Sequence, residues 1–210
     1  MNCLTIYRSH LSPIWCLSVH SKSDRFASGS MDQTVRLWTP EQPNILRTFI
    51  YHTNDINTLT FHPNGKYLAS GSNDGLILLW ALEQAQPARI LESSSPIEQL
   101  TFTSDGNQLI SINHNHEQKS DHISIWDIRT TKEIHLIENI SSDYCLLKSC
   151  QIENTNKFVT GFNKSLLFFD INSNLQEKCD AFRSDFSNED IKRLIHLSSK
   201  QSNKLIAIVE

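Results

Sequence analysis

Short apolar runs separated by Gly, Asp, Asn and Pro recur along the chain, and several alternate in the way that half-buried strands do. His62-Pro63-Asn64-Gly65 separates two of them, and its Asn-Gly pair favours a hairpin because both residues tolerate positive φ. In the first apolar run of the chain, residues 13–19, we expect Ile14, Cys16 or Leu17, and Val19 to be buried. The first eight predicted strands span residues 13–19, 25–30, 34–38, 45–50, 56–61, 66–70, 76–80 and 88–91.

An aromatic residue closes successive groups of strands at a regular interval. Trp38, Trp80, Trp126 and Phe169 are separated by 42, 46 and 43 residues. Repeats of ~40–45 residues with four short strands each are typical of β-propeller blades. The pattern therefore predicts an all-β fold, a propeller built from antiparallel hairpins.

The third unit departs from the first two. Ser111 follows Ile97 by fourteen residues, as in the earlier units, but Trp126 follows Ile97 by 29 residues where the spacing from Ile14 to Trp38 is 24. This five-residue insertion falls in the polar stretch 113–120, which we expect to loop out. The unit has Ser93 where the others have a histidine, and its Asp121 lies five residues before the tryptophan instead of six.

The fourth unit and the two ends keep less of the repeat. Leu146 and Thr160 keep the spacing of fourteen, and Phe169 replaces tryptophan. Residues 4–7 match the fourth strand of a preceding blade, and 191–197 with 205–209 match the first two strands of a following one. A short helix starting at Ile191 is the alternative, because Ser187-Asn188-Glu189-Asp190 could cap it.

The spacing of the repeats predicts one domain over residues 1–210. We expect an incomplete propeller, about four blades plus two partial blades, which forms an arc with open edges and not a ring. The predicted boundaries are a partial blade at 1–8, blades at about 9–50, 51–92, 93–137 and 138–180, and a partial blade at 181–210.

Two sets of polar residues repeat with identical spacing in the first two units. A Ser–His–Asp combination is the template for acyl transfer, but two copies with the serine inside a strand favour a structural role. We expect each His to bridge the Asp and the Ser, and each Ser to accept the indole N–H, so that buried polar groups are satisfied. No catalytic residue is predicted. The sets are His10, Ser28, Asp32 and Trp38, and His52, Ser70, Asp74 and Trp80.

Composition narrows the choice of partners. A net charge of −4 and a pI of 6.1 lack the basic excess of proteins that grip nucleic acid directly. The longest apolar stretches are too short to cross a membrane, and no signal peptide is visible. Five scattered cysteines indicate reduced thiols of a nuclear or cytosolic protein. His114-Asn115-His116 and His122 lack the further ligands of a metal site. We expect no metal, cofactor or small-molecule substrate.

Trp15 is the most suggestive single residue. It alternates with Ile14 near the start of an inner strand, so we expect it to point away from the core at the mouth of the propeller. An exposed aromatic there is typical of a binding hot spot, although Trp15 could instead wedge between blades. Corresponding positions complete a candidate partner-binding rim: Pro13, Met31, Asp55, Asn57, Asn73, Pro96 and Glu98.

Gly-Ser-x-Asp-x-x-x-x-x-Trp occurs twice, and with it the chain resembles the WD-repeat family. Ser9-His10 and Tyr51-His52 stand where Gly-His is usual, and only Trp126-Asp127 matches the Trp-Asp pair. Over residues 4–92 the chain looks most like the propeller of subunit 5 of the general transcription factor TFIID and its SAGA-type paralogue. The strings that carry this likeness are Tyr7-Arg8-Ser9-His10, Pro13-Ile14-Trp15, Asp55-Ile56 and Phe61-His62-Pro63-Asn64.

The resemblance implies a non-enzymatic scaffold that holds histone-fold subunits during initiation by RNA polymerase II in the nucleus. The acidic charge fits basic histone-fold partners slightly better than nucleic acid. A cytoplasmic WD-repeat adaptor, in ubiquitin ligation or RNA processing, is the alternative.

Overall fold

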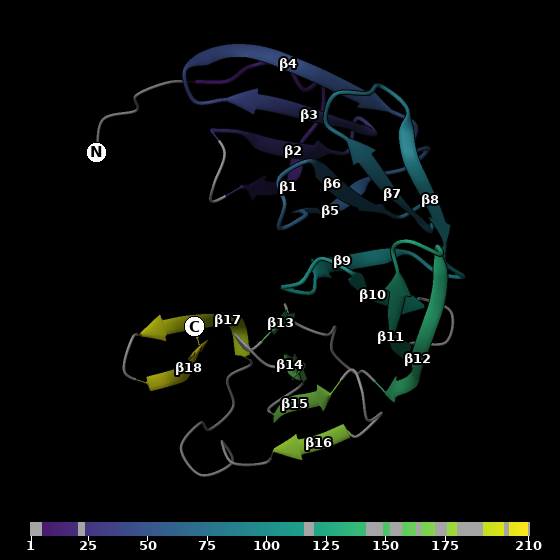
Figure 1. The fold of residues 1–210 in the computed structure, drawn as a ribbon, viewed down its shortest axis with the longest axis vertical. Helices are drawn as coiled ribbons and strands as arrows, with labels where there is room; N and C mark the ends of the chain where they lie inside the picture. The colour runs from purple at the N-terminus through teal and green to yellow at the C-terminus, as the bar shows by residue number, and fades with distance from the viewer. Residues whose placement is uncertain are drawn as a thin grey trace. The chain divides into compact units, whose positions relative to one another are not determined.

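Strands are the only regular elements in the described part of the chain, which confirms the predicted all-β, incomplete propeller. The structure, a computed structural model, describes residues 6–20, 24–115, 120–141, 149–151, 157–162, 165–170, 176–179, 191–199 and 202–209. Its strands form four-stranded antiparallel sheets and a two-stranded hairpin (Figure 1).

Three sheets belong to one compact unit, residues 1–115 and 123–137. Each pairs its strands in chain order, as consecutive hairpins. Blade 1 contains β1 (Ile14–Val19), β2 (Phe26–Ser30), β3 (Thr34–Thr39) and β4 (Gln42–Ile50). Blade 2 contains β5 (Ile56–Phe61), β6 (Tyr67–Ser72), β7 (Leu76–Ala81) and β8 (Pro87–Glu92). Blade 3 contains β9 (Ile97–Phe102), β10 (Gln108–Asn115), β11 (Ser120–Asp127) and β12 (Lys132–Ser141).

The second unit comprises residues 116–122 and 138–210. Phe158 pairs with Phe169 there as Phe26 pairs with Trp38 in blade 1. The helix considered at Ile191 is wrong, because a strand begins there, and Leu146 lies outside the described residues. Its strands are β13 (Ser149–Gln151), β14 (Lys157–Phe162), β15 (Ser165–Asp170), β16 (Gln176–Cys179), β17 (Ile191–Ser199) and β18 (Ser202–Val209).

The cores of the first unit lie between blades. In β7, Leu78 and Trp80 belong to the cluster shared with blade 1, whereas Ile77 and Leu79 belong to the cluster shared with blade 3. Alternate side chains of a strand point to opposite faces, so β7 is buried on both sides. This double burial explains why its sequence is a continuous apolar run and does not alternate with polar residues.

Glycines in the second strands of blades 1 and 2 allow the close approach of the next blade. A Cβ on Gly29 would lie 2.7 Å from Cγ2 of Ile56, and one on Gly71 would lie 2.5 Å from Cγ2 of Ile97. Both distances are far below van der Waals contact. The isoleucine that begins the first strand of one blade therefore packs directly on the glycine backbone of the blade before it.

A second contact between blades lies at the opposite end of these strands. His20 of blade 1 packs under Gly65 of blade 2, and His62 of blade 2 packs under Gly106 of blade 3. Nε2 of His62 donates a hydrogen bond to the Gly106 carbonyl oxygen, 2.8 Å away. This contact was not predicted from the sequence. The separation of 42 residues between the two histidines repeats the blade period and could have revealed it.

The predicted burial of β1 is wrong. Ile14 is 48% exposed, Leu17 66% and Val19 74%, whereas Ile56 at the matching position of blade 2 is 0% exposed. Ile56 is covered because it packs on the glycine strand of the preceding blade. A β-bulge between Ile14 and Cys16 also breaks the simple alternation on which the prediction depended.

The segment before β1 seals the outer half of blade 1. Tyr7 packs edge-on against Phe26 and Trp38, at centroid distances of 5.1 and 5.6 Å, and its hydroxyl donates to the Pro40 carbonyl. Phe49, 42 residues later, lies 5.0 Å from Trp80. Tyr7 thus occupies the place of a fourth-strand residue. Residues 6 and 7 nevertheless form no strand, contrary to the prediction for 4–7, and residues 4 and 5 lie outside the described part.

The insertion of the third unit lengthens a hairpin. β10 continues to Asn115 and β11 begins at Ser120. The loop predicted over residues 113–120 is therefore wrong at both of its ends, and residues 116–119 lie outside the described part. β10 and β11 have 8 residues each, whereas β6 and β7 of blade 2 have 6 each, so part of the insertion lengthens these strands.

Gly71→Ala is expected to lower the free energy of unfolding by roughly 1–3 kcal/mol, because the added Cβ forces blades 2 and 3 apart. Equilibrium denaturation measures the loss. In an Ile97→Ala background the same substitution should cost less, since the nearest clashing atom, Cγ2 of Ile97, is gone and Cγ2 of Thr58 at 2.8 Å is the main contact left. Equal costs in both backgrounds would contradict this packing.

Candidate functional site

The structure brings together the four polar and aromatic residues of the first predicted set. Nδ1 of His10 lies 2.8 Å from Oδ2 of Asp32, and Nε2 lies 2.7 Å from Oγ of Ser28. The Trp38 indole N–H donates to the same Ser28 oxygen over 2.9 Å. These residues form a tetrad that runs from the turn, across the strands, into the core.

The second set has the same geometry. His52 lies 2.9 Å from Asp74 through Nδ1 and 2.7 Å from Ser70 through Nε2, and Trp80 donates to Ser70 over 2.8 Å. Each aspartate also accepts from two backbone N–H groups, one in the loop before the first strand and one just after its own turn, those of Thr53 and Leu76 in blade 2. The tetrads therefore tie the loop before the first strand to the turn between strands two and three.

The donors and acceptors of the tetrad determine which atoms of His10 and Ser28 carry hydrogens. The Asp32 carboxylate can only accept, so Nδ1 of His10 carries a hydrogen. Ser28 accepts from Trp38 and its hydroxyl then donates to a bare Nε2. A neutral histidine satisfies every group, whereas a protonated one would displace the Ser28 hydroxyl hydrogen from its acceptor in a buried site.

This connectivity matches a catalytic Ser–His–Asp relay, but the serine is inaccessible. Ser28 is 1% exposed and Ser70 is 0% exposed. In each case the oxygen that would attack a substrate already accepts the indole hydrogen. A nucleophile needs an open approach to its oxygen, so the tetrad geometry is suited to holding strands together.

Both aspartates have pKa values below the ordinary carboxyl value. Burial favours the neutral form of Asp32, but hydrogen bonds from Thr34, the Leu11 N–H and His10 outweigh it and lower its pKa. Burial likewise opposes ionisation of Asp74, and His52 with backbone N–H donors lowers its pKa. Hydrogen bonds of the folded state therefore stabilise the charged form of both aspartates.

Blade 3 keeps only part of the tetrad. The Trp126 indole donates to Ser111 over 2.9 Å, and Asn113 donates its amide hydrogen to Ser93, which stands in the histidine position. The other end of the Asn113 amide, its buried Oδ1, has no hydrogen-bond partner among the residues that the structure describes. A buried unsatisfied carbonyl costs free energy, so this blade is held less well at the same place.

The predicted rim lies at one end of blades 1–3, where the first strands begin and the second strands end. The backbone of Met31 donates to Pro13, and that of Asn73 donates to Asp55. The Asn57 amide reaches across to the Ile97 carbonyl, 3.0 Å away. Pro13, Trp15, Met31 and Glu98 are exposed, whereas Asp55, Asn57, Asn73 and Pro96 are half-buried.

Trp15 is exposed and also contacts the next blade. Its side chain is 57% exposed, yet the indole N–H donates to Oδ2 of Asp55 in the next blade over 3.3 Å. The hydrogen bond fixes the ring at the seam between blades 1 and 2 while one face remains open. The seam thus presents a pre-oriented aromatic surface.

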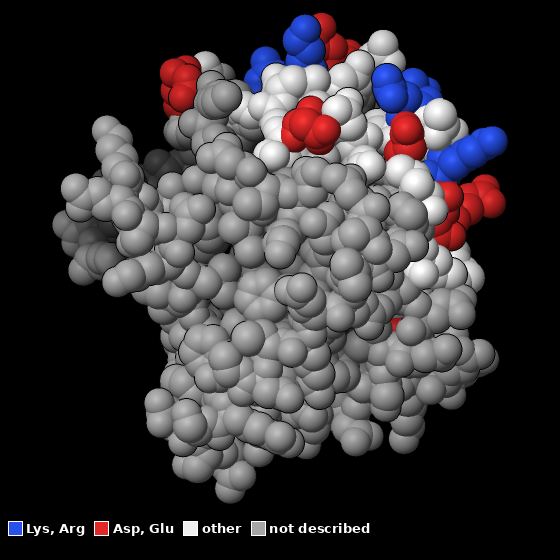
Figure 2. Space-filling model, turned by 60° about the horizontal axis from the view of Figure 1, so that its bottom comes forward, with Lys and Arg blue, Asp and Glu red and all other residues white. Residues whose placement is uncertain are grey.

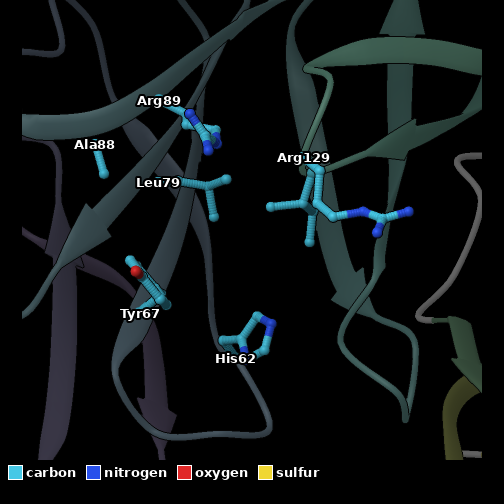
Figure 3. Close-up of a pocket in the computed structure, with 7 residues that line it drawn as sticks. His62, Tyr67, Leu79, Ala88, Arg89 and Arg129 are labelled. Carbon is cyan, nitrogen blue, oxygen red and sulfur yellow. The ribbon is translucent and has the colours of Figure 1, made fainter.

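A cleft of about 370 Å³ lies between blades 2 and 3, and the sequence analysis did not predict it (Figure 3). Both ring nitrogens of His62 already make hydrogen bonds: Nε2 donates to the Gly106 carbonyl, and Nδ1 accepts from the Asn64 N–H. His62 therefore lines the cleft without a ring nitrogen available to a bound molecule. In Figure 3 Arg89 lies beside Leu79, whereas the Arg129 guanidinium points away from Tyr67 and His62. The cleft can hold an apolar side chain. It is lined by His62, Tyr67, Leu79, Ala88, Arg89, Ile128 and Arg129.

Charge does not single out another surface. On the face shown in Figure 2, basic and acidic side chains are interspersed over the described residues. Those residues contain no group of three His, Cys, Asp or Glu side chains placed to hold a metal ion. Within the same segments no helix has the length and apolar character to cross a bilayer.

Comparison with protein-family models identifies the repeat. The model WD40, described as WD domain, G-beta repeat, matches residues 1–39 and 43–81. These two segments are similar to the WD40 repeat. No curated protein matches the sequence.

Solved structures share the fold over most of the chain. A chain in "Crystal Structure of Mitotic Checkpoint Complex" has 16% identity and a TM-score of 0.69, and covers 81% of this chain and 52% of its own length. "Structure of U3-55K" has 19% identity and a TM-score of 0.72, and the match covers 83% of this chain and 54% of that one. At these identities the likeness shows the fold alone, and the chain spans about half the length of the structures it matches.

His52→Ala and Asp74→Ala are each expected to lower the free energy of unfolding by roughly 1–3 kcal/mol, because each leaves buried partners unpaired. Denaturant titration followed by tryptophan fluorescence gives the values. The matched control, Asp24→Ala, removes an exposed carboxylate and should change stability little. If the tetrad variants kept full stability, these hydrogen bonds would not hold the blades together.

Acid should weaken the fold through the same aspartates. A carboxyl whose pKa is lowered on folding contributes stability that is present above its unfolded value, 3.8, and is lost as the pH falls towards the folded value. Between pH 7 and pH 3 the free energy of unfolding should therefore fall more steeply for the natural chain than for Asp32→Asn with Asp74→Asn. Parallel pH profiles would show that neither aspartate is linked to folding.

Proposed function

We propose that this WD40-repeat chain is a non-enzymatic protein-interaction scaffold, and that it acts as a WD-repeat subunit of TFIID in initiation by RNA polymerase II in the nucleus. Its partners in that role are histone-fold subunits. The observation that carries the proposal is the rim, with Trp15 exposed but fixed by Asp55.

The rim has the physical character of a protein-binding surface. A large aromatic that is held in place loses little side-chain entropy on binding, and such residues dominate binding energies. Pro13 and Met31 add exposed apolar area beside it. Apolar contact, and not a single charged group, therefore supplies most of the expected affinity.

The transcription assignment is supported by the sequence strings and by charge. The rim contains the carboxylates of Asp55 and Glu98 and no Lys or Arg. A partner with a basic surface, such as a histone-fold pair, would be oriented and drawn in by this charge. The resemblance of residues 4–92 to the TFIID subunit points to the same class of partner.

A cytoplasmic adaptor in ubiquitin ligation or RNA processing is the second candidate. The fold is shared with a chain of the mitotic checkpoint complex, so the same architecture serves an assembly of another kind. Capture experiments separate the two candidates, because only the first expects histone-fold pairs of TFIID to bind the purified chain.

Trp15→Ala should weaken capture of a purified TFIID histone-fold pair by tenfold or more, about 1.4 kcal/mol, while the melting temperature changes little. Binding is measured by titration of the labelled pair. Tyr67→Ala is the control, since Tyr67 is an exposed aromatic at the other end of blade 2 and should leave affinity unchanged.

Two outcomes would overturn the proposal. If the natural chain does not bind the histone-fold pair, the transcription role is wrong. If Trp15→Ala unfolds the protein instead of weakening binding, the ring is a packing wedge and the rim is not the binding surface.

A further inference from the structure

The cleft between blades 2 and 3 has a counterpart one repeat earlier, at the seam between blades 1 and 2. In blade 2, Leu79 of β7 pairs with Arg89 of β8, and in blade 1 Leu37 of β3 pairs with Arg47 of β4. Each counterpart precedes its equivalent by 42 residues, the blade period. The two seams can therefore be compared position by position, and their differences show what is particular to the cleft.

The wall that blade 3 supplies to the cleft also has a counterpart. The backbone N–H of Ile128 donates to the Asn107 carbonyl of its own blade, and that of Leu82 in blade 2 donates to the Lys66 carbonyl. Leu82 is 4% exposed, whereas Ile128 is half-buried. The apolar residue on this wall is therefore covered at the first seam and partly open at the second.

Two differences in sequence distinguish the second seam from the first. Ala88 stands where blade 1 has Leu46, so the outer strand presents a smaller side chain there. Arg129 stands where blade 2 has Glu83, so a basic residue replaces an acidic one. The seam between blades 2 and 3 thus combines open volume with two arginines, a combination that the repeat itself does not require.

Both arginines of the cleft can receive a carboxylate. Their side chains are exposed, and within the described segments neither guanidinium forms an ion pair or a hydrogen bond. The neighbouring Asp127 carboxylate accepts the backbone N–H groups of Arg129 and Thr130, which holds it in its own turn. A carboxylate is a preferred partner of a guanidinium, because the planar fork of donors matches its two oxygens.

The space between the arginines is apolar. Leu79, Ala88, Ile128 and the ring of Tyr67 line it, and in Figure 3 Arg89 lies beside Leu79. Its volume of about 370 Å³ falls at the lower end of the range for ligand sites, roughly 300–1,000 Å³. An occupant that matches the cleft therefore has an apolar group next to a negative charge.

We propose that this cleft binds an extended segment of a partner protein in which a leucine-sized side chain is followed by acidic residues. The apolar side chain enters between Leu79 and Ile128, and the carboxylates meet Arg89 and Arg129. An extended segment fits because Ala88 and Arg89 belong to β8, the outer strand of its sheet, whose backbone groups can hold a chain laid along it. The site is distinct from the Trp15 rim and does not depend on the proposed transcription role.

Titration of the isotope-labelled full chain with short peptides, followed by nuclear magnetic resonance, tests the proposal. The probe is a heptapeptide of glycine and serine that contains one leucine followed by two glutamates. We expect the amide signals of Ala88, Arg89, Ile128 and Arg129 to shift and to saturate. The dissociation constant should be roughly 10 μM to 1 mM, because one buried side chain and exposed ion pairs supply modest free energy. The indole signal of Trp15 should not move.

Three variants of the full chain locate the binding. Ala88→Phe fills the cleft from an exposed position and should abolish the shift at Ile128. Arg89→Glu should weaken binding of the glutamate peptide about threefold or more, and strengthen binding of a peptide with lysines in place of the glutamates. The matched control is Arg47→Glu, which makes the same charge change at the equivalent position of blade 1 and should leave both affinities unchanged.

Several results would overturn the proposal. The first is an absence of saturating shifts up to about 2 mM peptide, beyond the expected dissociation constant. Equal binding of a peptide with serine in place of leucine, or equal binding to Ala88→Phe, would show that no apolar side chain enters the cleft. Equal weakening by Arg47→Glu would reduce the effect to overall charge. None of these results bears on the histone-fold pair, whose binding at the rim is measured separately.

Discussion

The close contact between an isoleucine and a glycine backbone governs this fold. A β-sheet can pack at this distance only if the facing strand has no side chain at the point of contact. Gly29 and Gly71 provide that point, and Ile56 and Ile97 fill it. The angle and spacing of neighbouring blades, and thus the alignment of their rims, follow from this one arrangement.

The polar tetrads act on a different part of each blade. The glycine contact fixes the inner strands against the next blade, whereas the chain from Trp80 through Ser70 and His52 to Asp74 fixes a loop to its own sheet. Apolar packing sets the distance between sheets, and directional hydrogen bonds set the path of the loops. The two devices are complementary because dispersion is tolerant of direction and hydrogen bonds are not.

Sequence reasoning reached the tetrads and the blade period because both recur at fixed spacing. It failed for Ile14, since a residue identical in type to Ile56 is exposed or buried according to its neighbour and not its own chemistry. The cleft between blades was also out of reach, because Tyr67 and Ile128 meet only after two repeats pack. Local patterns predict elements, whereas surfaces between repeats depend on their assembly.

The shared cores bear on how the chain matures during synthesis. Contacts such as that between the Cys16 thiol and the Ile56 carbonyl join residues 40 apart, one repeat length. A blade leaving the ribosome therefore cannot bury its trailing face until the next repeat has been made. Folding should advance behind translation in steps of one blade, with each unfinished face exposed to chaperones for the time that one repeat takes to translate.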